Sequence, residues 1–170
     1  MLYFAGLEPS QEFELKLEHS VPLAVTFSPQ IQHECCRYAR YGNGQSRFAE
    51  IGVNERNLAI KSFTLLSLTS NVVSRKLDFE LYPLNDCQEG IPKLSLRDVA
   101  KDSQEIYFDF FDDKLTLLCG SQNSRILLYP DTEAVSYVDS NGIEFGFSSD
   151  KLLVSIGLRG IGWQLAEVVT

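Results

Sequence analysis

The sequence has few of the residues on which most catalytic and metal sites depend. Its 170 residues include only two histidines, four cysteines, one tryptophan and one methionine. His19 follows Glu18 in an expected turn, where a solvated side chain is the simplest explanation. His33 lies near Cys35 and Cys36, but a structural zinc site needs four ligands and no second Cys/His pair is close in sequence. We therefore predict no catalytic residue, no metal site and no cofactor.

Long apolar runs are also missing. No stretch approaches the ~20 apolar residues that span a bilayer, and the N-terminal segment reaches Glu8 and Pro9 without a basic region before them. Cys35 and Cys36 are adjacent, while Cys87 and Cys119 lie far apart, which is not the spacing of a disulfide framework. These features predict a cytoplasmic protein with reduced cysteines and no membrane contact.

Motifs for phosphate and calcium are incomplete. Gly157-Leu-Arg-Gly160-Ile-Gly162 has the wrong spacing for a dinucleotide loop, and only eight residues follow it, too few for the helix and crossover of such a site. Asp109, Asp112 and Asp113 lack the central glycine and closing glutamate of a calcium-binding loop. The glycine segment is better explained by bulges or close packing in a terminal hairpin, and the aspartates by a turn with solvated carboxylates.

Basic residues are fewer than acidic ones, and the excess of acidic residues lies in one segment. The chain carries a formal net charge of −8 with a pI of about 4.7, which makes nucleic acid an unlikely main ligand and favours a basic protein partner. Residues 102–150 contain ten acids against two bases, Lys114 and Arg125, so this segment alone accounts for the net charge.

Alternation of apolar and polar residues runs along most of the chain and predicts β-strands. The expected strands are 12–18, Val21–Phe27, Phe48–Val53, Leu58–Leu68, Leu77–Tyr82, Ile106–Phe111, Leu115–Cys119, Arg125–Tyr129, Ala134–Asp139, Ile143–Phe147, Leu152–Leu158 and Gly162–Val168. Residues 31–47 are expected to form a surface loop, and a short helix is expected from Ser95 to about Lys101. The predicted fold is a single mainly β domain over residues 1–170, an antiparallel two-sheet sandwich or strongly curved sheet built from hairpins, with one or two short helices.

A cryptic repeat connects the two halves of the sequence. Glu50-Ile51-Gly52-Val53 matches Glu144-Phe145-Gly146-Phe147 at an offset of 94 residues, and the apolar positions that follow also match. The match has two explanations: a duplication, or convergence of hairpins that each bury one face.

The excess acids and the tyrosines among them predict a docking surface for a basic partner, because aromatics supply contact area and carboxylates supply steering. The residues predicted to bind the partner are Tyr107, Asp109, Asp112, Asp113, Tyr129, Asp131, Glu133, Tyr137, Asp139, Glu144 and Asp150.

Two hairpin sequences carry a resemblance to a known group of proteins. Arg47-Phe-Ala-Glu-Ile-Gly-Val with Asn57-Leu-Ala-Ile-Lys-Ser-Phe-Thr-Leu-Leu, and Gly142-Ile-Glu-Phe-Gly-Phe with Lys151-Leu-Leu-Val-Ser-Ile, resemble hairpins of immunity proteins from bacterial polymorphic-toxin and contact-dependent growth-inhibition systems. The resemblance covers roughly residues 47–68 and 142–158. It implies a non-catalytic cytoplasmic protein that neutralises a cognate toxin C-terminal domain, often a nuclease with a basic cleft. These proteins share no active-site motif, so no residue role is carried over.

Two other functions are compatible with the sequence. A small β-sandwich enzyme or carbohydrate-binding module would use a concave sheet face, although no carboxylate pair stands out for catalysis. A nucleic-acid-binding module would use the Arg37–Arg47 loop, where three arginines and two tyrosines alternate with small residues.

Overall fold

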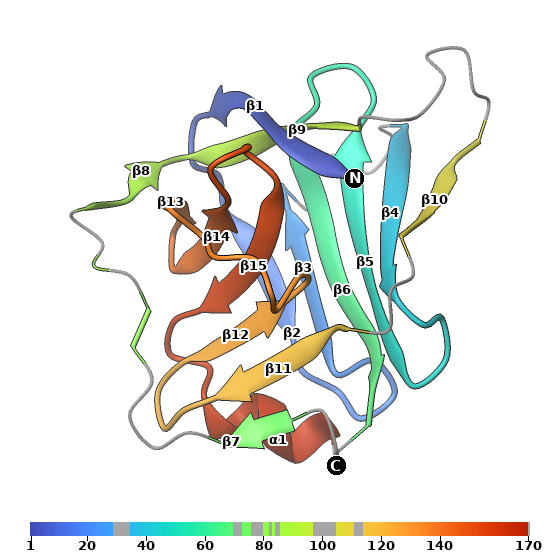
Figure 1. The fold of residues 1–170 in the computed structure, drawn as a ribbon, viewed down its shortest axis with the longest axis vertical. Coiled ribbons are helices and arrows are strands. Elements are labelled where there is room, and N and C mark those ends of the chain that lie inside the picture. The colour runs from blue at the N-terminus through green and yellow to red at the C-terminus, as the bar shows by residue number, and fades with distance from the viewer. Residues whose placement is uncertain are drawn as a thin grey trace.

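The chain forms a mainly β structure, as predicted (Figure 1). The computed structural model describes residues 1–28, 35–69, 73–75, 80–81, 83, 86–96, 105–110 and 114–169. Within these residues there are fifteen strands in three sheets and one short helix. In this described part of the chain, no helix is both long and apolar enough to cross a membrane.

The first large sheet has six strands in the order β10-β4-β5-β6-β3-β2. Its strands are β2 (Phe13–Lys16), β3 (Leu23–Phe27), β4 (Cys36–Gly42), β5 (Arg47–Asn54), β6 (Ile60–Leu68) and β10 (Tyr107–Phe110). All neighbours are antiparallel except β10, which joins β4 in parallel.

The second large sheet has seven strands in the order β7-β11-β12-β15-β14-β13-β8. Its strands are β7 (Val73–Arg75), β8 (Gln88–Glu89), β11 (Thr116–Cys119), β12 (Ser124–Leu127), β13 (Ser136–Ser140), β14 (Ile143–Phe147) and β15 (Leu153–Leu158). Each edge strand pairs in parallel with its neighbour, β7 with β11 and β8 with β13. The expected antiparallel pattern therefore holds inside this sheet but not at its edges.

A two-stranded ribbon and a helix complete the fold. The strands β1 (Leu2–Glu8) and β9 (Ile91–Leu96) pair with each other across one end of the large sheets, and α1 (Trp163–Val169) lies at the other end (Figure 1). The core fills the space between the large sheets, where Phe27 of β3 and Phe145 of β14 meet with ring centroids 6.2 Å apart. Alternation places one face of each strand in this core, because successive side chains point to opposite faces.

The two large sheets contain the same five-stranded unit. In both units, strands pair antiparallel in the same order, with β2, β3, β6, β5 and β4 corresponding to β11, β12, β15, β14 and β13. The registers also correspond. The row across the outer face of the first unit is Tyr38, Gly52, Ser62, Thr26, Glu14, and the row across the second is Tyr137, Gly146, Ser155, Leu127, Thr116.

Contacts with the β1–β9 ribbon follow the same symmetry. The Phe4 N–H donates to the Lys151 carbonyl at 2.8 Å, and the Leu94 N–H donates to the Leu58 carbonyl at 2.7 Å. Leu58 and Lys151 hold matching places before β6 and β15, with φ of 65° and 67°. Because Phe4 and Leu94 are themselves register partners, an approximate two-fold axis passes near this pair. A shared topology, register and turn conformation favour duplication over convergence as the origin of the sequence repeat.

Several local predictions were wrong. Residues 36–42, expected within a loop, form β4, because Arg37 and Arg40 find acidic partners in Glu55 and Asp109, and Ala39 and Tyr41 are buried in the core. The C-terminal strand expected at Gly162–Val168 is α1, which buries Leu165 and Ala166.

Three further expectations concern residues 77–101. Ser95 and Leu96, expected to open a helix, end β9 instead, and 97–101 lie outside the described residues. Most of the strand expected at 77–82 is also outside them. Neither β1 nor β9 was predicted.

Candidate protein-binding surface

The residues predicted to bind a partner do not form one patch. Of the eleven, nine belong to the described residues, and they fall into a buried pair, a pair on the β4–β10 edge, two half-buried tyrosines and a group of three acids around a surface hollow. Asp112 and Asp113 lie outside the described residues.

Glu144 and Asp139 form the buried pair and make internal ion pairs. Glu144 is 0% exposed, and its two carboxylate oxygens lie 2.6 Å from Arg125 Nη2 and 3.4 Å from Arg159 Nη2. Asp139 accepts a hydrogen bond from the Gly142 N–H at 2.9 Å and pairs with Arg159 at 3.3 Å. Both acids are buried and engaged in ion pairs within the molecule, so the geometry disfavours the predicted contact of these two residues with a partner.

Another segment covers the outer face of the second unit beside Glu144, which explains why this acid is buried. A side-chain carbon placed on Gly157 would meet Leu81 at 2.7 Å and the Glu144 carboxylate at 3.2 Å, so Leu81 lies over the ion pairs. Burial, followed by the negative charges of Glu144 and Asp139, raises the pKa of the nearby Cys87 thiol. Burial and these two charges therefore favour the neutral thiol of Cys87, and Arg159 opposes them.

Tyr107 and Asp109 lie on the β4–β10 edge. The Tyr107 ring stacks on Tyr38 with centroids 5.5 Å apart, and the Arg40 guanidinium lies 4.7 Å above Tyr107. Arg40 also pairs with Asp109. The arginine and tyrosine residues considered for nucleic-acid binding thus lie in β4, apart from Arg47, which begins β5. Arg37 and Arg40 pair with the protein's own acids, Glu55 and Asp109.

Tyr129 and Tyr137 are both half-buried. Tyr129 meets Tyr41 edge-on with centroids 5.9 Å apart, while the Tyr137 hydroxyl donates to the Ala134 carbonyl at 3.1 Å. Both tyrosines make contacts within the molecule, and Tyr137 also lines a second surface hollow together with Glu133.

Asp131, Glu133 and Asp150 gather around one hollow on the surface, with a volume of about 430 Å³. The remaining lining residues are Tyr3, Thr132, Val135, Ser148, Ser149 and Leu152. Val135 is 59% exposed and adds apolar surface beside the three acids. Asp131 pairs with Lys114 at 2.7 Å, but its side chain is 77% exposed and the pair is open to solvent.

Two turns and one long-range contact build the hollow. The Thr132 N–H donates to the Tyr129 carbonyl in the turn that presents Asp131, and the Lys151 N–H donates to the Ser148 carbonyl in the turn that presents Asp150. Tyr3 joins them because it forms an isolated β-bridge with Leu152. No local sequence pattern marks Tyr3 or Val135, since only the crossing of β1 brings Tyr3 to this place.

The matching place in the first unit has a different residue where Tyr3 stands. The corresponding bridge there joins Lys93 to Ala59, and Lys93 pairs with Glu8 at 2.7 Å. The aromatic ring that lines the acidic hollow is therefore not repeated in the first unit.

The chemistry available in the hollow is attraction of cations and burial of apolar surface. The described residues that line it offer carboxylates, hydroxyls, a tyrosine and apolar groups, with neither histidine nor cysteine. No protein-family model matches the chain, and no curated protein matches it either.

Proposed function

We propose that this protein is a non-catalytic binder of a basic protein, and that the acidic hollow of Asp131, Glu133 and Asp150 receives that partner. The single observation that carries the proposal is the gathering of these three acids around an opening lined also by the exposed Val135 and the half-buried Tyr3. All three acids belong to the segment with excess negative charge.

The mixture of groups suits protein recognition. Exposed carboxylates attract a basic surface and orient its approach, whereas Val135 and Tyr3 offer apolar area that a partner side chain can bury. The Lys114–Asp131 pair costs little to break, because exposed ion pairs contribute about 0–1 kcal/mol.

The resemblance of the two hairpins suggests the kind of partner. We propose an immunity protein that binds and blocks the C-terminal domain of a cognate toxin in the cytoplasm. A toxin domain that binds nucleic acid carries a basic cleft, and an acidic hollow is complementary to it.

The test is binding to the toxin domain encoded directly upstream of this chain's gene. Wild type should bind it in calorimetry, with an association rate that falls as salt is added. Asp150→Lys should slow association several-fold and leave the free energy of unfolding nearly unchanged.

Glu89→Lys is the matched control, because Glu89 is exposed on β8 and the substitution changes the net charge equally. Equal effects of the two substitutions would place the interface away from the hollow. Absence of any binding to the toxin domain would reject the proposed function.

A further inference from the structure

The two units differ at one edge of their sheets. In the second unit, β7 pairs in parallel along the outer edge of β11, with Leu117 opposite Val73 and Cys119 opposite Arg75. The corresponding edge of the first unit is the outer edge of β2. No strand in the described part of the chain pairs with that edge.

The difference appears in the burial of matching side chains. Leu115, Leu117 and Cys119 are each 0% exposed. The residues at their places in the first unit are Phe13, Leu15 and Leu17, and these are only partly buried although they pack against the same core. The edge of β2 thus leaves apolar surface open that the second unit covers.

The backbone of β2 is also oriented for pairing. The Ser28 N–H donates to the Glu12 carbonyl at 2.9 Å. Hydrogen-bonded and non-hydrogen-bonded residue pairs alternate along antiparallel strands. The backbone groups of Glu14 and Lys16 therefore bond to β3. The N–H and C=O groups of Phe13, Leu15 and Leu17 point outward, away from β3. In the second unit, the Gly120 N–H donates to the Asn123 carbonyl. By the same alternation, the backbone groups of Leu117 and Cys119 point toward β7.

We propose that the outer edge of β2 binds an extended segment of a basic protein partner, added in parallel as β7 is added to β11. The charges specify the segment. Glu12, Glu14 and Glu18 alternate with the apolar positions and outnumber Lys16, so the complementary strand alternates aliphatic with basic residues. Aliphatic side chains would cover Phe13, Leu15 and Leu17.

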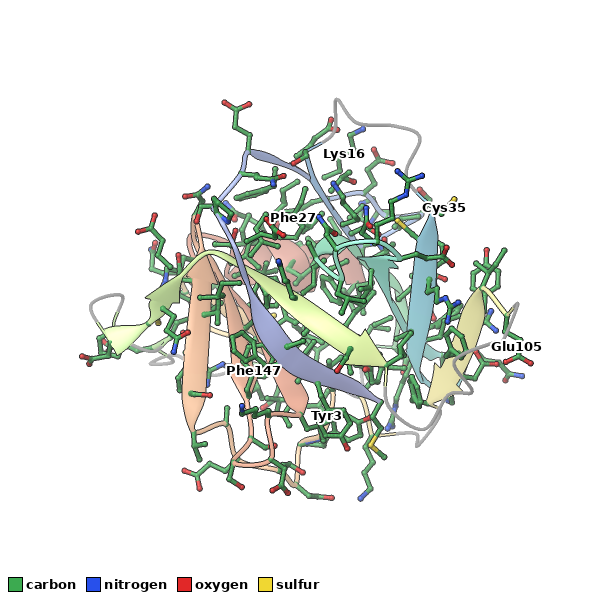
Figure 2. All side chains as sticks on the ribbon, turned by 90° about the horizontal axis from the view of Figure 1, so that it is seen from above. Tyr3, Lys16, Phe27, Cys35, Glu105 and Phe147 are labelled. Carbon is green, nitrogen blue, oxygen red and sulfur yellow. The ribbon has the colours of Figure 1, made fainter. Side chains whose placement is uncertain are left out.

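This inference goes beyond the proposed function and concerns a different surface. Lys16 and Tyr3 lie on opposite sides of the molecule (Figure 2). The edge can bind a strand whether or not the acidic hollow binds a toxin domain.

The first experiment uses the peptide Lys-Val-Lys-Val-Lys-Val-Lys and amide hydrogen exchange measured by NMR on the full chain. Bound peptide should protect the amides of Phe13, Leu15 and Leu17, while those of Glu14 and Lys16 change little because they already bond to β3. A peptide with glutamate in place of lysine should bind at least about tenfold more weakly. Unchanged exchange at the three outward amides under saturating peptide would overturn the proposal.

A spin label on the peptide's N-terminus tests the direction of pairing. Strongest broadening at Phe13 supports the parallel arrangement. Strongest broadening near Leu17 would overturn it.

Variants separate this edge from the hollow. Leu15→Pro removes one outward N–H without touching a bond to β3 and should weaken peptide binding at least about tenfold. Glu14→Lys should weaken peptide binding as well. Because the Glu14 side chain is exposed, this substitution should not disturb folding. Glu133→Lys in the hollow should leave peptide binding unchanged, and an equal loss in both charge variants would overturn the assignment to β2.

A second copy of the chain is the competing occupant. Sedimentation of the unliganded protein should show a monomer. A dimer that dissociates in Leu15→Pro would replace the partner strand by a second copy and overturn the proposal.

Discussion

Glu144 is the residue whose internal role is clearest. Its carboxylate is fully buried between Arg125 and Arg159. Truncating one member of a buried ion cluster leaves the others without a counter-charge, so Glu144→Ala should lower the free energy of unfolding by about 3–5 kcal/mol in urea denaturation. Asp150→Ala, at an exposed turn, should change it by less than about 0.5 kcal/mol. Equal values would mean that the ion pairs of Glu144 contribute nothing to stability.

Glu50 is expected to make stability depend on pH. Burial is the larger influence and raises its pKa above the ordinary 4.5, while the nearby Arg40 lowers it. With a raised pKa, the Glu50 carboxyl of the folded protein keeps its proton at pH values where the same carboxyl of the unfolded chain has lost it. Stability therefore falls as pH rises from about 4.5 through the folded pKa, and the loss is complete above it.

The variant Glu50→Gln tests this dependence. The free energy of unfolding of the variant, relative to wild type, should rise between pH 4 and pH 7 in urea titrations. A difference that is constant over this range would contradict a raised pKa.

At the scale of strands, the matching glycines Gly52 and Gly146 leave room for side chains of the neighbouring strands. A side-chain carbon on either glycine would collide with the hydroxyl of the serine on the next strand, Ser62 or Ser155, and one on Gly52 would also lie only 3.0 Å from the Tyr38 ring. Gly52→Ala should therefore destabilise the protein by about 1–3 kcal/mol in thermal unfolding. Adding Ser62→Ala should recover part of the loss, and no recovery would place the strain elsewhere.

Hairpins were predictable from sequence because their turns carry local signals. Asn141-Gly142 between alternating segments predicts a tight turn, and both residues have positive φ, 53° and 98°. β4 was missed because its charged residues are neutralised by acids distant in sequence, which no local pattern reveals. α1 was mistaken for a strand because a seven-residue helix is too short for a clear helical period.

The candidate site was predictable only in part, for a related reason. Alternation correctly places Glu144 on the opposite face from Phe145, but this outer face is covered by Leu81. Phase along a strand tells which face a side chain occupies, and it does not tell whether another segment covers that face. Asp131, Glu133 and Asp150 are exposed because they lie in turns and loop ends, where burial requires contacts that the chain does not supply there.

At the scale of the whole molecule, the halves are expected to unfold together. β10 belongs to the second half of the chain but pairs with β4, and β1 crosses to bond with the turn before β15. Unfolding of one unit would therefore also break strand pairing and hydrogen bonds of the other.

Two probes can follow the units separately. The single tryptophan, Trp163, reports on the second unit by fluorescence, and amide exchange in β5 reports on the first. Both should give the same urea midpoint. Different midpoints would indicate that the units are independent.

The pairing of β1 with β9 has a consequence for the order in which the chain is made. Leu2 is fully buried, yet its register partner Leu96 is synthesised much later. After it leaves the ribosome, β1 must therefore remain without its partner until Leu96 has been translated. During that interval its apolar side chains are exposed, and nascent chains stalled before and after Leu96 should differ in whether chaperones bind β1.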